Sequence, residues 1–89
     1  MAEIRKKAVA GTMESSDAYV EIEPGAGEIE IRLDSVVQQQ FGSAIETVIR
    51  EVLCDCGVES AKVNVIDRGA LDCVIRARVE TAVLRGKGE

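Results

Sequence analysis

The chain has 89 residues and a net charge of −5, with 46% hydrophobic and 30% charged residues, which is typical of one globular domain spanning residues 1–89. Because it contains no histidine, a Ser-His or Cys-His nucleophile pair and histidine-ligated zinc are excluded within the chain. The acidic balance and the near absence of aromatic side chains also argue against binding to nucleic acids, which requires clustered basic residues or stacking platforms.

The first half of the chain predicts strands. Residues 7–13 alternate weakly, the segment ESSD at 14–17 is typical of a turn, and residues 18–23 alternate clearly between apolar and charged side chains. The segment PGAG at 24–27 is a strong turn signal, and residues 28–33 alternate again. Two alternating runs around a turn predict an antiparallel hairpin that is charged on one face.

The second half predicts a helix, a strand and a second helix. Apolar residues at helical spacing indicate a helix at about 35–56, with Asp34 or Ser35 as its N-cap. Residues 61–66 alternate as a short strand. Asp67 begins a turn and could cap the helix predicted at 70–85. We therefore expect an α+β two-layer sandwich, in which two helices pack on one face of a small, mostly antiparallel sheet in the order strand-strand-strand-helix-strand-helix.

Several groups of polar residues have ordinary structural explanations. Cysteines two positions apart on a helix point to nearly opposite sides, so Cys54 and Cys56 are expected to be small residues in or near the core, as is Cys73, and no metal site is predicted. A solvated strand face explains the acidic residues Glu21, Glu23, Glu28 and Glu30. Helix surface charge explains the arginines of the last predicted helix better than an anion site does; they are Arg68, Arg76, Arg78 and Arg85.

Two serine segments are candidate attachment sites for a cofactor. Ser35, in the sequence Asp-Ser-Val, resembles the Asp-Ser-Leu motif of four-helix acyl carrier proteins, but helix capping explains it fully. Ser15 and Ser16 lie in a predicted exposed turn flanked by acids. Without a neighbouring base, a hydroxyl in that turn is an acceptor for modification and not a nucleophile in turnover.

Three stretches resemble the citrate lyase acyl carrier protein, the gamma subunit of that complex. They are AGTMESSD at 10–17, DSVVQQQFG at 34–42 and GALDCVIRARV at 69–79. No single stretch is a widely known motif, but together and in this order they are specific, and the resemblance runs from about Ile4 to Arg85.

The resemblance implies a non-catalytic carrier whose prosthetic group is attached at Ser15, with Ser16 left open as the alternative. The implied group derives from 2'-(5''-triphosphoribosyl)-3'-dephospho-coenzyme A, is joined through a phosphodiester and is installed by a dedicated transferase. The alpha subunit then exchanges acetyl for citrate on the thiol of that group, and the beta subunit cleaves the citryl group to oxaloacetate and regenerates acetyl-carrier. Such a carrier needs no acid, base or metal of its own, which agrees with a chain that lacks histidine.

Two other functions remain open on the residues alone. A small α+β module that binds a ligand or a partner without covalent modification fits the same pattern of elements, because a fold does not dictate a function. A free-standing enzyme has less support, since no convergent set of catalytic residues is visible. No run of ~20 apolar residues suggests a membrane span, no secretory signal is visible, and three cysteines fit a reducing compartment. We therefore expect a cytoplasmic protein.

Overall fold

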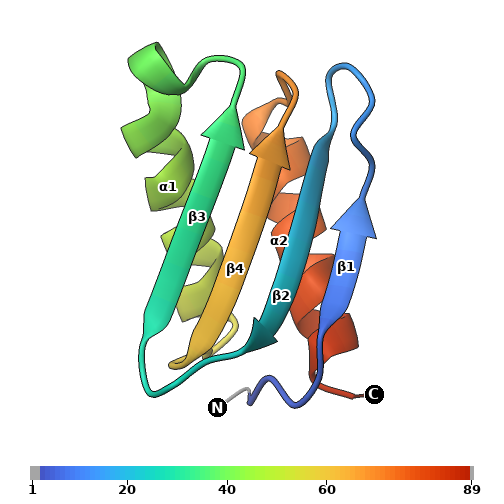
Figure 1. The fold of residues 1–89 in the computed structure, drawn as a ribbon, viewed down its shortest axis with the longest axis vertical. Coiled ribbons are helices and arrows are strands. Elements are labelled where there is room, and N and C mark those ends of the chain that lie inside the picture. The colour runs from blue at the N-terminus through green and yellow to red at the C-terminus, as the bar shows by residue number, and fades with distance from the viewer. Residues whose placement is uncertain (1–2, 89) are drawn as a thin grey trace.

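The computed structural model describes residues 3–88, and it consists of one four-stranded sheet and two helices (Figure 1). The elements in chain order are β1 (Ala8–Gly11), β2 (Ala18–Pro24), β3 (Ile29–Ser35), α1 (Gln38–Asp55), β4 (Ala61–Asp67) and α2 (Asp72–Gly86). Both helices lie behind the same face of the sheet (Figure 1). The predicted α+β two-layer architecture and its element order are confirmed.

The strand order in the sheet is β1-β2-β4-β3. The pairs β1–β2 and β2–β4 are antiparallel, and β3–β4 is parallel, so the sheet is mostly antiparallel, as predicted. The predicted hairpin between residues 18–23 and 28–33 is wrong, because β4 lies between β2 and β3. Adjacent parallel strands need a long crossover, and α1 supplies it between β3 and β4.

The segment between β2 and β3 passes over the beginning of β4 instead of closing a hairpin. The Ala61 N–H donates a hydrogen bond to the Glu28 carbonyl (3.1 Å), and the Gly27 N–H donates one to Ser60 Oγ (2.9 Å). A Cβ atom at Gly25 would lie 2.5 Å from the Ala61 nitrogen. Glycine at position 25 therefore lets the two backbones pass closely enough for the incoming strand to insert.

The core fills the space between the sheet and the two helices. The alternation in β2 points Val20 and Ile22 inward, and both are fully buried. From the helices, the buried side chains are Ile45, Val48, Ile49, Val52 and Leu53 of α1 and Ile75, Val79, Ala82 and Val83 of α2. All the buried hydrophobic residues among residues 3–88 are aliphatic, as expected for a chain so poor in aromatic residues.

Both helices begin later than predicted. The helix expected from residue 35 begins at Gln38 after Val37, and no side chain caps it. Ser35 is the last residue of β3, so the prediction of Asp34 or Ser35 as an N-cap is wrong. The second helix follows Leu71, again without a side-chain cap. Neither helix in the described range combines the length and hydropathy of a transmembrane segment.

Candidate functional site: the turn between β1 and β2

The residues between β1 and β2 form a tight turn at the end of the molecule that lies away from both termini (Figure 1). The Asp17 N–H donates a hydrogen bond to the Glu14 carbonyl (3.2 Å), which closes a four-residue β-turn. Ser15 and Ser16 occupy the two central positions, and both are exposed. Ser16 has φ of 66°, the one positive value at a non-glycine residue among residues 3–88. This pattern is typical of a type II turn, which favours glycine at its third position.

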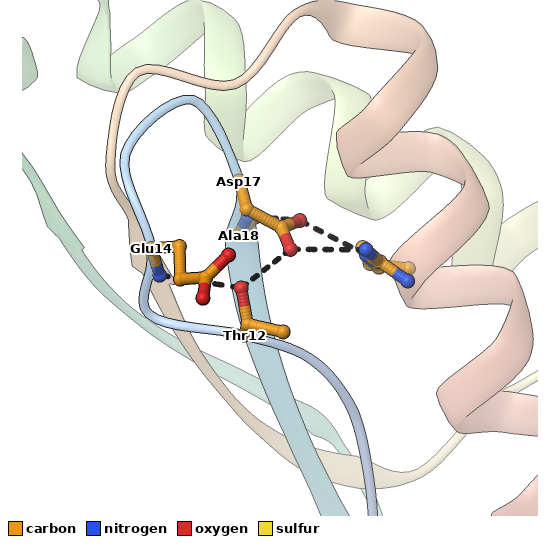
Figure 2. A network of polar contacts seen from close by, with 5 residues as sticks. Thr12, Glu14, Asp17 and Ala18 are labelled. Atoms are coloured by element: carbon orange, nitrogen blue, oxygen red, sulfur yellow. Dashed lines mark hydrogen bonds and ion pairs between the residues drawn. The ribbon is translucent and has the colours of Figure 1, made fainter.

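Asp17 fastens the base of this turn to α2. Its carboxylate accepts two hydrogen bonds from Arg78, at 3.0 Å from Nε and 2.9 Å from Nη2. It also accepts one from Thr12 Oγ1 at 2.6 Å and one from the Ala18 N–H at 2.7 Å, and Figure 2 shows the carboxylate pointing from the turn towards α2. Thr12 Oγ1 in turn accepts from the Glu14 N–H (3.2 Å). A paired Arg–carboxylate contact fixes orientation as well as distance, so the turn has a defined geometry.

The contacts of the Asp17 carboxylate with Arg78, Thr12 and the Ala18 N–H form a clamp on the turn. This clamp should make the stability of the protein depend on pH in the acidic range. The hydrogen bonds from Arg78, Thr12 and the Ala18 N–H hold the pKa of Asp17 well below its usual range. As the pH falls, Asp17 of the unfolded chain is therefore protonated near pH 4, before Asp17 of the folded chain. The clamp stabilises the fold fully above about pH 4 and progressively less as the pH falls below it. We expect Asp17→Asn to lower the Tm at pH 7. The difference in Tm between the variant and the wild type should narrow towards about pH 2–3.

Differential scanning calorimetry from pH 7 downwards measures this gap. Glu46→Gln is the matched control, because it also removes one carboxylate, from the exposed pair between Glu46 and Arg50 (3.3 Å) on α1. Its Tm should stay close to that of the wild type throughout. A gap between Asp17→Asn and the wild type that widens with acidification would contradict the clamp.

A second loop, between β4 and α2, holds the other side of the turn. The Ser16 N–H donates to the Arg68 carbonyl (2.8 Å), and the Arg68 N–H donates to the Asp17 carbonyl (2.9 Å). The loop itself is anchored by the buried Asp67, which accepts from the Ala70 N–H (2.9 Å). Asp67 thus organises the loop before α2, and the prediction that it caps the helix is wrong.

Ser35, the other candidate serine, is a half-buried residue at the end of β3. Its hydroxyl donates to Asp67 Oδ2 (2.7 Å) and accepts from the Val37 N–H (3.1 Å). The hydroxyl therefore connects the loop after β3 to the loop after β4. This role differs from the predicted helix cap, and it commits the hydroxyl to neighbours within the fold.

The cysteines and the acidic strand residues lie away from the turn. Cys56 packs partly against the core, whereas Cys54 and Cys73 are exposed, in contrast to their expected place in or near the core. Burial, together with the nearby carboxylates Glu80 and Asp55, raises the pKa of the Cys56 thiol. No group of three or more possible metal ligands occurs within residues 3–88.

The acidic face is not a continuous row of carboxylates. Because β4 separates β2 from β3, Lys62 stands between Glu23 and Glu30 in the strand register. Glu21 pairs with Lys7 of the segment before β1 (3.3 Å). The outer face is thus a solvated surface of mixed charge, as the alternation of the strands suggested.

No sequence pattern singles out Arg78 or Arg68 as neighbours of the serine turn. Arg78 is 61 positions from Asp17, and both arginines had been assigned to surface charge on one helix. In the structure Arg68 lies in the loop before α2, while Arg76 pairs with Glu51 of α1 (2.9 Å). The sequence contains one weak signal for these neighbours: the hydroxyls and carboxylates of the turn need hydrogen-bond donors, which must come from elsewhere in the fold.

Exposed apolar side chains also lie in the loops and the helix start at the same end of the molecule as the turn (Figure 1). Each of four residues there is more than half exposed: Met13, Val36, Phe41 and Leu71. They come from the turn, the loop after β3, the first turn of α1 and the loop before α2. Four of the six exposed large hydrophobic side chains of the described residues thus lie at the end that carries Ser15.

Sequence comparison finds close relatives along nearly the whole chain. A family model described as malonate decarboxylase delta subunit (MdcD) matches residues 5–86. The citrate lyase acyl carrier protein of Klebsiella pneumoniae is 55% identical over 84 residues, covering 93% of this chain and 87% of its own length. The protein of the same name from Haemophilus influenzae (strain PittEE) is 50% identical over 86 residues, covering 97% and 90%.

Structural comparison finds the same fold in a known assembly. A chain in the crystal structure of a Pseudomonas malonate decarboxylase hetero-tetramer in complex with malonate superimposes with a TM-score of 0.80. The match covers 94% of this chain and 87% of the other, at 24% sequence identity. At that sequence identity, the similarity supports a shared fold alone.

Proposed function

Because this chain belongs to the citrate lyase acyl carrier proteins, we propose that it carries its acyl group on a prosthetic arm joined to Ser15. The observation that carries the assignment to this residue is the geometry of the turn. Ser15 is exposed at the tip, while the two residues after it are fastened, Ser16 and Asp17 by their backbones to the loop after β4 and Asp17 by its carboxylate to α2. A modifying protein can reach the hydroxyl without unfolding any element.

The residues around Ser15 fit a phosphodiester-linked arm derived from 2'-(5''-triphosphoribosyl)-3'-dephospho-coenzyme A. The hydroxyl has open solvent around it, and the Asp17 carboxylate, which would repel a phosphate, is already paired with Arg78. When bound, the group supplies a terminal thiol that holds acetyl or citryl as a thioester. The chain contributes a rigid base for a flexible tether, which raises the local concentration of the acyl group at successive active sites.

Attachment requires a base that this chain does not provide. Joining the Ser15 oxygen to the innermost phosphorus of the triphosphate would release pyrophosphate, and the hydroxyl proton would have to be accepted by a base. The chain has no histidine, and the Asp17 carboxylate at the base of the turn is committed to Arg78 and Thr12. We therefore assign the proton acceptor to the transferase that installs the arm.

We propose that its partners are that transferase and the alpha and beta subunits of a cytoplasmic citrate lyase. The alpha subunit would exchange acetyl for citrate on the arm, and the beta subunit would release oxaloacetate. The exposed apolar side chains at the same end of the molecule support docking there, because each partner must approach the base of the arm. The acidic net charge of −5 favours partner surfaces with basic rims.

The intact mass of the protein isolated from cells with active citrate lyase tests the assignment. We expect the mass of the chain plus one arm. Trypsin should release residues 8–32 as one peptide that contains Ser15 and Ser16, and its fragment ions then locate the added mass. A native carrier with the bare mass, or with its arm on another residue, would defeat the proposal.

A further inference from the structure

We propose that Arg68 binds the phosphate through which the arm is joined to Ser15. This inference rests on the proposed function, because it assumes a phosphate ester at that hydroxyl. Arg68 holds the turn through its backbone, and its exposed side chain is left for another contact. Guanidinium groups match the geometry of phosphate oxygens and can bind two of them at once.

The backbone contacts bring Arg68 next to the modified residue and keep it there. Its carbonyl accepts from the N–H of Ser16, the residue after Ser15, at 2.8 Å. Its own N–H donates to the carbonyl of Asp17 at 2.9 Å. The buried Asp67 immediately before it ties this loop to Ser35 at 2.7 Å. The distance between Ser15 and Arg68 is thus determined by two anchored loops.

Arg68 is also the arginine whose charge remains available near this turn. Within residues 3–88, Arg78 is paired with Asp17, Arg76 with Glu51, and Arg85 with a backbone carbonyl. The structure gives the Arg68 side chain no such partner in that range. A phosphate on Ser15 would have one unneutralised guanidinium on the adjoining loop, which favours a new charge-assisted contact.

The charged groups around a phosphate at this position come from three parts of the fold. The turn contributes Glu14, which is exposed, and Asp17, which is neutralised by Arg78 of α2. The loop before α2 contributes Arg68, with Asp67 buried beneath it. The balance of charge at the phosphate therefore depends on Arg68 opposing Glu14.

A phosphoserine placed at position 15 of the full chain provides a probe that does not need the arm. The second pKa of a phosphomonoester lies near 6, and 31P NMR titration measures it directly. We expect Arg68→Gln to raise that pKa by a few tenths of a unit relative to the parent phosphoprotein, the size expected for an exposed ion pair. The difference should shrink in high salt.

Arg5→Gln is the matched control, because Arg5 is exposed and its backbone contacts Gly86 near the opposite end of the molecule. It removes the same charge and should leave the phosphate pKa unchanged. Equal titration curves for the parent and Arg68→Gln, with both proteins folded by circular dichroism, would overturn the inference. The 31P titration does not depend on native loading, so its result is separate from the intact-mass and peptide results that test the proposed function.

Discussion

Replacing Ser15 with alanine is expected to abolish covalent loading completely, while Ser16→Gly loads at a rate close to that of the wild type. Under the proposed function the phosphodiester needs the Ser15 oxygen, and no atom of an alanine at that position can form the bond. Ser15 is exposed and has ordinary negative φ, so alanine there should change the free energy of unfolding by less than ~0.5 kcal/mol. Loss of loading would then reflect chemistry and not folding.

Ser16→Gly is the control for Ser15→Ala, because it also removes a hydroxyl from the turn. Ser16 has φ of 66°, a conformation that costs an L-residue roughly 1–2 kcal/mol and that glycine adopts freely. The glycine variant should therefore be at least as stable as the wild type. Loading is measured by intact mass after incubation with the transferase and its triphosphoribosyl donor. Loading of Ser15→Ala together with loss of loading in Ser16→Gly would move the attachment site to Ser16.

Gly11→Ala is expected to be the most destabilising small substitution at the base of the turn, by about 2–5 kcal/mol. Gly11 ends β1 with φ of 91°, which strains any other residue by about 1–2 kcal/mol. In addition, a Cβ atom there would overlap the carbonyl oxygen of Ala18 on the neighbouring strand. Relieving that overlap requires a backbone shift, which typically costs a further ~1–3 kcal/mol.

Gly27→Ala separates these two contributions. Gly27 also has a positive φ, of 101°, but a Cβ atom there would meet nothing within 4 Å. Urea denaturation of both variants should place Gly11→Ala about 1–3 kcal/mol below Gly27→Ala, which isolates the cost of the overlap. Equal stabilities for the two variants would show that β1 and β2 separate here without penalty.

A shift of the strands at Gly11 should also disturb the turn between β1 and β2, since Thr12 follows directly and Asp17 lies opposite. The hydrogen bond from Thr12 to Asp17 (2.6 Å) closes this end of the two strands. A folded fraction of Gly11→Ala is therefore expected to load more slowly than the wild type. Slow loading in a variant that retains Ser15 would show that the shape of the turn matters as well as its hydroxyl.

The strands and helices were predictable because local pattern controls them. Val20 and Ile22 alternate with Glu21 and Glu23, so a strand with one buried face is the arrangement that removes the apolar side chains from water. Helical spacing in residues 44–53 identified α1 in the same way. The start of α1 was misplaced because local composition near Ser35 favours a cap, whereas the hydroxyl donates to Asp67 across the fold (2.7 Å).

The turn at Glu14–Asp17 and its exposed serines also followed from the sequence, because short polar residues between two alternating runs favour a turn regardless of what surrounds them. The tertiary structure decided which strands pair and what holds that turn. Alternation shows that a strand has a buried face but not which neighbour completes its hydrogen bonds, so β4 could insert between β2 and β3. Arg78 and Arg68 reach the turn for the same reason: contacts between residues distant in the chain depend on how the layers pack, and packing is a property of the whole chain.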